Sequence, residues 1–267
     1  MTPPVTTSHP GRFARWGPWR LIPAEPRRLK LIFLHGFGSS PRELKPLGQR
    51  LYRSGFHVVA PLLPGHGERS VGMNSCGLED WEEAVRLTFE SLHQDGSPVA
   101  VVGFCLGGVL GLTTARELNP RALVCLSTPV TRLDETLFPA AENDLPSTES
   151  LQQDCQSGEA RRWRRRGCHP VVTRHFLETY QEAIVKGAER ATEVRCPTLV
   201  VGGGKSRVVR SEDGEKLHQL LPLEIEKDFH LAPQSGHAVP VDHGRREVYR
   251  RVDEFLLEID STDDSRF

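Results

Sequence analysis

Val101-Val102-Gly103-Phe104-Cys105-Leu106-Gly107-Gly108 is the stretch of sequence that decides the fold. An apolar run over residues 99–103 leads into it, and an apolar segment over residues 106–118 follows it. Gly103 and Gly107 stand two residues before and two residues after Cys105. A sharp strand–turn–helix connection brings backbone segments too close for side chains at those two places. The spacing therefore predicts such a turn, with Cys105 at its apex and at the N-terminus of a helix.

Short apolar runs alternate with amphipathic stretches on both sides of this turn. The apolar runs predict strands at residues 31–34, 57–60, 99–103, 122–126, 198–201 and 223–231. Helical spacing of apolar residues predicts helices at residues 42–53, 81–92, 106–118, 211–220 and 244–259. Such alternation indicates an α/β fold, with a mostly parallel central sheet flanked by helices. Residues 13–23 are a candidate for a small antiparallel hairpin at the sheet edge.

The alternation fails between residues 130 and 194, where the sequence is polar, charged and mostly helical in pattern. This stretch is too long for an ordinary connection, so we expect an inserted helical cap over the carboxyl edge of the sheet. The predicted core then comprises residues 12–129 and 195–260. Residues 1–11 and 261–267, rich in Pro, Ser, Thr and Asp, are expected to be flexible ends.

Composition excludes several classes of function. The chain has 267 residues and a formal net charge of -1, so no basic surface for nucleic acid is expected. Its longest apolar run, residues 98–112, is shorter than the roughly 20 residues that a membrane span needs. The six cysteines lack paired spacing, which predicts free thiols in the cytoplasm. Cys155, Cys168 and His169 match no common zinc pattern, and we predict no metal site.

Three segments predict one site at the carboxyl edge of the sheet. Cys105 at a helix N-terminus is placed where the helix dipole and free N–H groups favour a thiolate. His35-Gly36-Phe37-Gly38 follows a strand, and Ser235-Gly236-His237 precedes the last helix. We expect Cys105 to be the nucleophile and His237 the general base. The backbone N–H groups of Phe37 and Leu106 are the expected oxyanion donors.

Together with Pro64-Gly65-His66-Gly67-Glu68 and Pro197-Thr198-Leu199-Val200-Val201, these segments resemble the α/β-hydrolase family over residues 31–257. The resemblance is to small carboxylesterases and monoacylglycerol-lipase-like enzymes. A cysteine at this position resembles dienelactone hydrolases and polyhydroxyalkanoate synthases, although the chain lacks the extra N-terminal region of those synthases. The resemblance implies an α/β-hydrolase fold and an acyl hydrolase of the carboxylesterase, lipase or thioesterase type. It further implies a covalent acyl-enzyme, a small acyl-ester or thioester substrate, and no cofactor.

One position departs from the family pattern. The loop after residues 198–201, where the family places its catalytic Asp, holds Ser206. Loss of that Asp costs a serine triad about 10⁴ in kcat, whereas a cysteine, with its more acidic thiol, depends on it less. Cys105 and Ser206 are therefore interpreted as matched changes in an active Cys–His site. The alternatives are a catalytically degenerate binding or regulatory protein, and a Cys-dependent acyltransferase or cyclase. Asp213 and Asp134 could supply a displaced acid, but neither matches the family position.

Some residues carry a simpler interpretation beside the functional one. His35 and His66 are expected to support loop structure, and Cys125 to be a small buried side chain. The Arg-rich run 161–166 is either a solvated helix face or an anion site for an acidic substrate end or an acyl carrier. Apolar residues recur at helical spacing in the cap, where they either line an acyl pocket or pack the cap onto the core: Val171, Val172, Phe176, Leu177, Tyr180 and Ile184.

Overall fold

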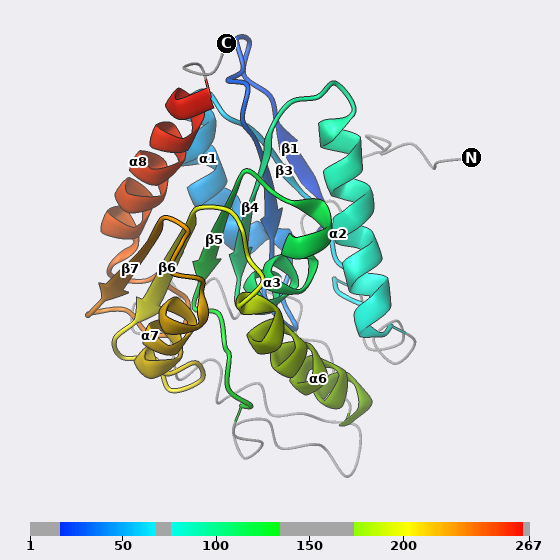
Figure 1. The fold of residues 1–267 in the computed structure, drawn as a ribbon, viewed down its shortest axis with the longest axis vertical. Helices are drawn as coiled ribbons and strands as arrows, with labels where there is room; N and C mark the ends of the chain where they lie inside the picture. The colour runs from blue at the N-terminus through cyan, green and yellow to red at the C-terminus, as the bar shows by residue number, and fades with distance from the viewer. Residues whose placement is uncertain (1–16, 68–75, 134–173, 264–267) are drawn as a thin grey trace.

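A single seven-stranded sheet organises the chain (Figure 1). The computed structural model describes residues 17–67, 76–133 and 174–263. The strand order is β1-β3-β2-β4-β5-β6-β7, and every neighbouring pair is parallel except β1 with β3. The strands are β1 (Trp19–Leu21), β2 (Lys30–Leu34), β3 (His57–Ala60), β4 (Val99–Phe104), β5 (Ala122–Leu126), β6 (Thr198–Gly203) and β7 (Lys227–Ala232).

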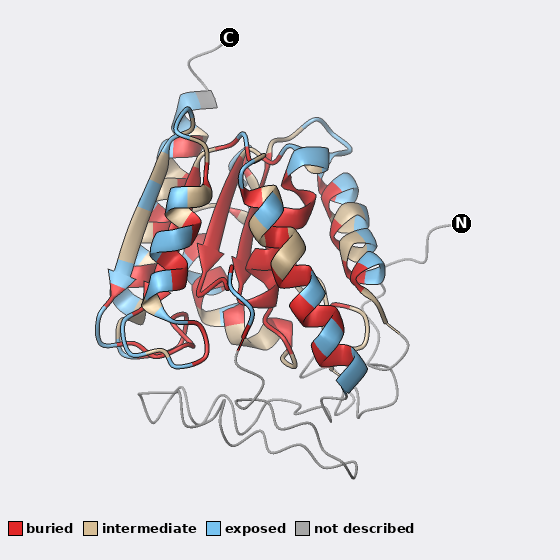
Figure 2. Ribbon diagram, turned by 60° about the horizontal axis from the view of Figure 1, so that its bottom comes forward, coloured by how far each residue is buried: buried red, intermediate tan, exposed pale blue. Residues whose placement is uncertain are grey.

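Helices cover both faces of this sheet. One face carries α1 and α8, which contact each other, and the other carries α2, α3 and α7 (Figure 1). A further helix, α6, packs against α3. The helices are η2 (Pro41–Leu44), α1 (Lys45–Arg53), α2 (Leu78–His93), α3 (Leu106–Leu118), α6 (Arg174–Ala191), α7 (Ser211–Leu220) and α8 (Arg245–Asp263). Figure 2 shows that buried residues fill the central strands and the helix faces turned toward them.

The central strands are uniformly buried because helices lie on both of their faces. All residues of β4, β5 and β6 are buried, as expected for the middle of a parallel sheet. This is why their sequences are continuous apolar runs without alternation. The edge strand β7 is largely polar, with only its last residue buried.

Several predicted elements differ from the structure at their ends. The predicted helix 42–53 divides into η2 and α1, because Pro46 has no N–H to continue the first helix but fits the first turn of the second. The predicted strand 223–231 begins only at Lys227, and Leu223 is 87% exposed in the turn after Pro222. Within the described part of residues 13–23, the predicted hairpin is the single strand β1 against β3.

The predicted cap, residues 130–194, is described by the structure only in part. Residues 134–173 lie outside the described residues. This range contains Asp134, Cys155, Cys168, His169 and the Arg-rich run 161–166. The described portion of the predicted cap includes α6, which is helical as expected. Among the described helices, none is long and apolar enough to cross a bilayer.

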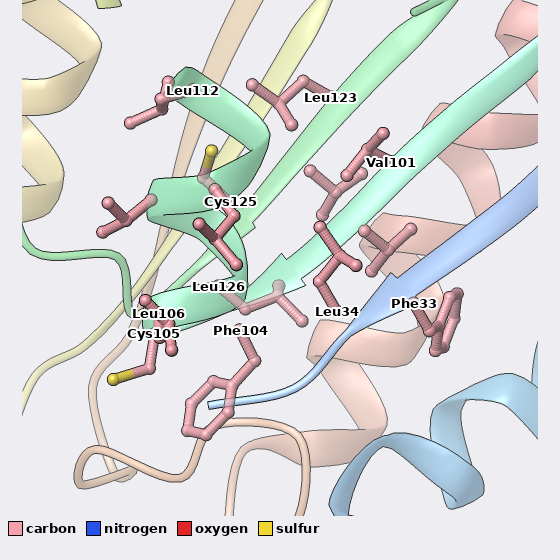
Figure 3. Packing of buried hydrophobic residues seen from close by; sticks show 14 of the residues in the cluster. Phe33, Leu34, Val101, Phe104, Cys105, Leu106, Leu112, Leu123, Cys125 and Leu126 are labelled. Atoms are coloured by element: carbon pink, nitrogen blue, oxygen red, sulfur yellow. The ribbon is translucent and has the colours of Figure 1, made fainter. Parts of the chain in front are cut away.

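The turn between β4 and α3 is as tight as its glycines predict. A Cβ atom on Gly103 would overlap the carbonyl of Gly107, and one on Gly107 would overlap the carbonyl of Leu34. Figure 3 shows Cys105 where β4 enters α3, with its sulfur pointing away from the labelled core side chains. Close backbone approach therefore fixes the position of Cys105.

We predict that Gly107→Ala lowers the free energy of unfolding by about 3 kcal/mol or more, because the new methyl group meets rigid backbone. Urea denaturation measures this change. Gly77→Ala is the matched control, since a Cβ there would meet nothing closer than Asp80 Oδ2 at 3.9 Å. The control should lose less than about 1 kcal/mol. Equal losses in the two variants would contradict a close-packed turn.

Candidate active site

The predicted site residues all follow the carboxyl ends of parallel strands. Phe37 follows β2, Cys105 follows β4, Ser206 follows β6 and His237 follows β7. Since these ends meet at one edge of the sheet, the four segments lie along one rim, where open α/β sheets bind ligands. Topology alone thus explains why residues far apart in the sequence approach each other.

Cys105 has a backbone conformation that residues other than glycine seldom adopt. Its φ is 53° and its ψ is -113°, in a left-handed region that costs a non-glycine residue about 1–3 kcal/mol. Two hydrogen bonds hold the backbone in this strained conformation. The Cys105 N–H donates to Leu126 O at 2.9 Å, and the Gly108 N–H donates to Cys105 O at 3.0 Å. The residue is the N-cap of α3, whose first N–H groups have no partners within the helix. Leu106 is the first residue of α3, so its N–H is one of these groups.

The thiol of Cys105 is nearly buried, and a tyrosine from α6 covers it. Cys105 is 4% exposed, and its Sγ lies 3.0 Å from the hydroxyl oxygen of Tyr180. Tyr180 is fully buried. Sequence patterns placed Tyr180 among the apolar cap residues but did not predict this contact. Helical spacing revealed the buried face of α6, whereas nothing in the sequence indicated which tertiary neighbour would meet the hydroxyl.

Phe37 links the predicted oxyanion loop to the same helix. Its ring stacks on Tyr180, with centroids 4.4 Å apart and planes at 12°, and on Phe176, with centroids 4.6 Å apart. The preceding N–H of Gly36 donates to Glu43 Oε1 at 2.7 Å, which ties the loop to η2. An apolar aromatic wall therefore stands beside Cys105, and α6 provides most of it.

The His237 loop is held by two buried side chains. Asp242 Oδ2 accepts a hydrogen bond from Gly236 N–H at 2.9 Å, and Ser235 Oγ accepts one from Gly244 N–H at 2.9 Å. The His237 ring lies 5.1 Å from the ring of Phe104, the neighbour of Cys105. The structure thus brings His237 to the turn that carries Cys105, the predicted nucleophile. Sequence patterns did not single out Asp242, although a lone carboxylate after an apolar run is a signal of a buried anchor.

Ser206 lies in the turn next to the His237 loop. Its Oγ accepts a hydrogen bond from Val209 N–H at 3.2 Å, and the neighbouring Lys205 N–H donates to Ser235 O at 2.9 Å. Asp213, the possible displaced acid, is buried elsewhere. Its Oδ1 accepts hydrogen bonds from Thr131 N–H and Oγ1–H and from Val130 N–H, so this carboxylate anchors the segment that follows β5.

His35 and His66 lie beneath the aromatic wall, and their contacts are structural. His35 Nε2 accepts a hydrogen bond from Leu63 N–H at 3.1 Å. The His66 ring packs on Phe176 at 5.3 Å and on Trp81 at 5.9 Å. Burial lowers the pKa of His66 to about 4 and that of His35 well below its ordinary value, so both rings are neutral near pH 7. Their expected role in supporting the loops agrees with these contacts.

Two further cysteines serve as a contrast to Cys105. Burial raises the pKa of Cys125 and of Cys196 to about 12, so neither forms a thiolate at neutral pH. Figure 3 places the sulfur of Cys125 among apolar side chains beneath α3. The described residues contain no cluster of three or more His, Cys, Asp or Glu side chains able to hold a metal ion.

Comparison with known proteins gives consistent relatives. A family model described as the alpha/beta hydrolase family matches residues 31–251. A carboxylesterase of Bacillus subtilis (strain 168) is 24% identical over 240 residues, which cover 86% of this chain and 93% of the relative. A thermostable monoacylglycerol lipase of Bacillus sp. (strain H-257) is 23% identical over 238 residues, or 87% and 92% of the two chains. A solved metagenome-derived lipolytic enzyme shares the fold, with a TM-score of 0.78, 19% identity and coverage of 91% and 98%.

We predict that stability decreases as the pH falls from about 6.5 to about 4. The His66 pKa is about 4 in the folded chain and 6.5 when exposed, so the unfolded state binds the extra proton in this range. Full protonation of His66 in the unfolded state lowers the free energy of unfolding by roughly 3 kcal/mol. Urea unfolding at several pH values measures it.

The amide of His66→Asn can still donate to Pro64 O. In this variant, unfolding between about pH 4 and about pH 6.5 should take up about one proton fewer, so the free energy of unfolding should depend less on pH. His175→Gln, at an exposed position on α6, is the matched control and should keep the parent's slope. A His66→Asn variant with the parent's pH dependence would show that His66 is not the titrating group.

Proposed function

The chain belongs to the alpha/beta hydrolase family, and we propose that it is an acyl hydrolase that cleaves ester bonds through Cys105 and His237. The observation that carries the proposal is the strained turn at Cys105, held at the N-terminus of α3 with φ 53°. A strained backbone at this place is stabilised by its surroundings and keeps the side chain directed at the sheet edge. The carboxylesterase and monoacylglycerol lipase among the relatives support an ester as the substrate.

The proposed reaction proceeds through a covalent acyl-enzyme. His237 accepts the proton of Cys105 Sγ, and the sulfur electron pair forms a bond to the acyl carbon. The carbonyl oxygen takes up the negative charge and accepts hydrogen bonds from Phe37 and Leu106 N–H groups. When the carbonyl re-forms, the bond to the alcohol oxygen breaks, and this oxygen takes the proton from His237. Water then gives a proton to His237 and attacks the acyl carbon. When the carbonyl re-forms, the C–S bond breaks, the carboxylic acid leaves, and Sγ takes back the proton from His237.

The surroundings of Cys105 favour an apolar acyl group. Phe37, Phe176 and Tyr180 form the aromatic wall beside the thiol, and such a wall binds hydrocarbon in preference to a charged group. A small ester with an apolar acyl chain is therefore the proposed substrate, and a thioester with the same acyl chain would present the same carbonyl. The Arg-rich run 161–166 lies outside the described residues, so its role toward an anionic substrate or acyl carrier stays a prediction.

Cys105 and Ser206 are proposed to be matched changes. A thiol forms an ion pair with imidazole more readily than a hydroxyl does, so a carboxylate behind the histidine contributes less. Ser206 supports the turn by accepting the Val209 N–H. The competing proposal is a degenerate binding or regulatory protein, and reactivity of the Cys105 thiol discriminates between the two.

We predict that Cys105 is the most reactive of the six thiols at neutral pH, because it lies at a helix N-terminus and near an imidazole. Iodoacetamide labelling followed by peptide mapping measures each rate. Cys125 and Cys196 are internal controls and should label only after unfolding, since their pKa values are about 12. If Cys105 labels no faster than Cys155 or Cys168, it is not an activated nucleophile.

We further predict that Cys105→Ser lowers hydrolysis of p-nitrophenyl acetate by about 100-fold or more, because a serine needs the missing carboxylate. Cys105→Ser combined with Ser206→Asp should recover about tenfold of that loss. An aspartate at position 206 can also accept the Val209 N–H, so the turn is kept. Ser206→Asp alone is the control for effects on the parent site. A Cys105→Ser variant more active than the parent would contradict matched changes.

A further inference from the structure

The hydroxyl oxygen of Tyr180, on α6, lies 3.0 Å from the sulfur of Cys105. We propose that Tyr180 is a positioning residue for the nucleophile: its hydroxyl donates a hydrogen bond to the Cys105 thiolate and stabilises the attacking form. The proposal rests on the proposed function, in which that thiolate is the nucleophile. It assigns to a cap residue part of the charge stabilisation that a triad carboxylate would otherwise supply.

The tyrosine ring is held in place independently of its hydroxyl. Phe37 stacks on the ring of Tyr180 and on that of Phe176, which is one helical turn earlier on α6. Phe176 in turn packs edge-on against Trp81, with centroids 5.2 Å apart. The phenol is therefore fixed between the oxyanion loop and α3, and the hydroxyl position is set by ring packing.

The helix that carries Tyr180 makes two further close contacts with its surroundings. At Gly187, α6 approaches α3 so closely that a Cβ would lie 3.0 Å from Val109 Cγ1. Gln181 is buried, donating to Leu133 O at 2.9 Å and accepting from Leu133 N–H at 3.1 Å. Both contacts lie on the same helix as Tyr180. The Sγ–hydroxyl contact is thus part of a rigid arrangement, as a positioning role requires.

The chemistry of the two groups fixes the direction of the hydrogen bond in the reactive state. An ordinary phenol titrates near pH 10 and a thiol near pH 8.5, so the thiol loses its proton first and the tyrosine is still protonated when the thiolate forms. The thiolate has no proton to give, and only the tyrosine O–H can donate. Hydrogen bonds to an ionised acceptor are stronger than those to a neutral one, so the contact favours the thiolate over the thiol.

The same hydrogen bond acts again when the acyl-enzyme breaks down. As the C–S bond breaks, its electron pair returns to Sγ, and the Tyr180 O–H stabilises the developing thiolate as the leaving group. No atom is transferred to or from Tyr180, which keeps its proton throughout. The competing possibility is that Tyr180 only shields the sulfur, in which case its ring is needed and its hydroxyl is not.

Tyr180→Phe separates these two roles, because it keeps the ring that stacks on Phe37 and removes only the hydroxyl. The rate of Cys105 alkylation by iodoacetamide is followed from about pH 5 to about pH 10, without substrate, by peptide mapping. We expect the midpoint to rise by about one pH unit, with the plateau at high pH unchanged, which makes the rate near pH 7 about tenfold slower. The pH profile of kcat/KM for p-nitrophenyl acetate should shift by the same amount. Tyr52→Phe removes a half-exposed hydroxyl on α1 and should match the parent.

An unchanged midpoint in Tyr180→Phe, or faster alkylation at every pH, would overturn the proposal and leave Tyr180 as a shield. The Cys105→Ala variant tests the proposed function separately. Ester hydrolysis that survives Cys105→Ala would refute the nucleophile, whatever the Tyr180 titration gives. Hydrolysis that depends on Cys105 while Tyr180→Phe keeps the parent's midpoint would refute only the role of Tyr180.

Discussion

The close approach of β4 and α3 at Cys105 is the constraint on which the rest of the molecule depends. Backbone atoms occupy the space that side chains would need at Gly103 and Gly107, so the chain can turn sharply only with glycine there. That turn directs the sulfur of Cys105 toward the hydroxyl of Tyr180, while the Cys105 backbone stays bound to Leu126 of β5. Stability of the surrounding parallel sheet offsets the strain, and the α/β-hydrolase architecture maintains the backbone of Cys105 in an uncommon conformation.

The proposed mechanism distributes charge stabilisation differently from a serine triad. A triad places a carboxylate behind the base, whereas this chain has Ser206 in that loop and a tyrosine hydroxyl at the nucleophile. In the proposed mechanism, the N-terminus of α3 and the Tyr180 hydroxyl both stabilise the Cys105 thiolate directly, whereas a triad carboxylate acts on the histidine. Because Tyr180 lies on α6, any movement of that helix would also change the nucleophile's environment. The reactivity of Cys105 and the position of the cap helix are therefore coupled in this mechanism.

Patterns local to the chain predicted the fold well. The glycine spacing around Cys105 and the apolar runs predicted the parallel sheet and its helices, and the family match confirms the α/β-hydrolase fold. Local misreadings occurred where proline decided the outcome, as at Pro46 and after Pro222. Contacts across the fold could not be read from the sequence. The Tyr180 hydroxyl at Cys105 depends on how segments 75 residues apart pack, which no periodicity encodes.

Trapping the acyl-enzyme tests the role of Cys105 most directly. The protein is mixed with p-nitrophenyl acetate, quenched in acid during turnover and analysed by peptide mass spectrometry. A Cys105 nucleophile predicts an acetyl group on the peptide that contains Cys105, attached to sulfur and absent after treatment with hydroxylamine. Turnover of the ester without acetylation of Cys105, or stable acetylation with no turnover, would contradict a Cys105 acyl-enzyme as the catalytic intermediate.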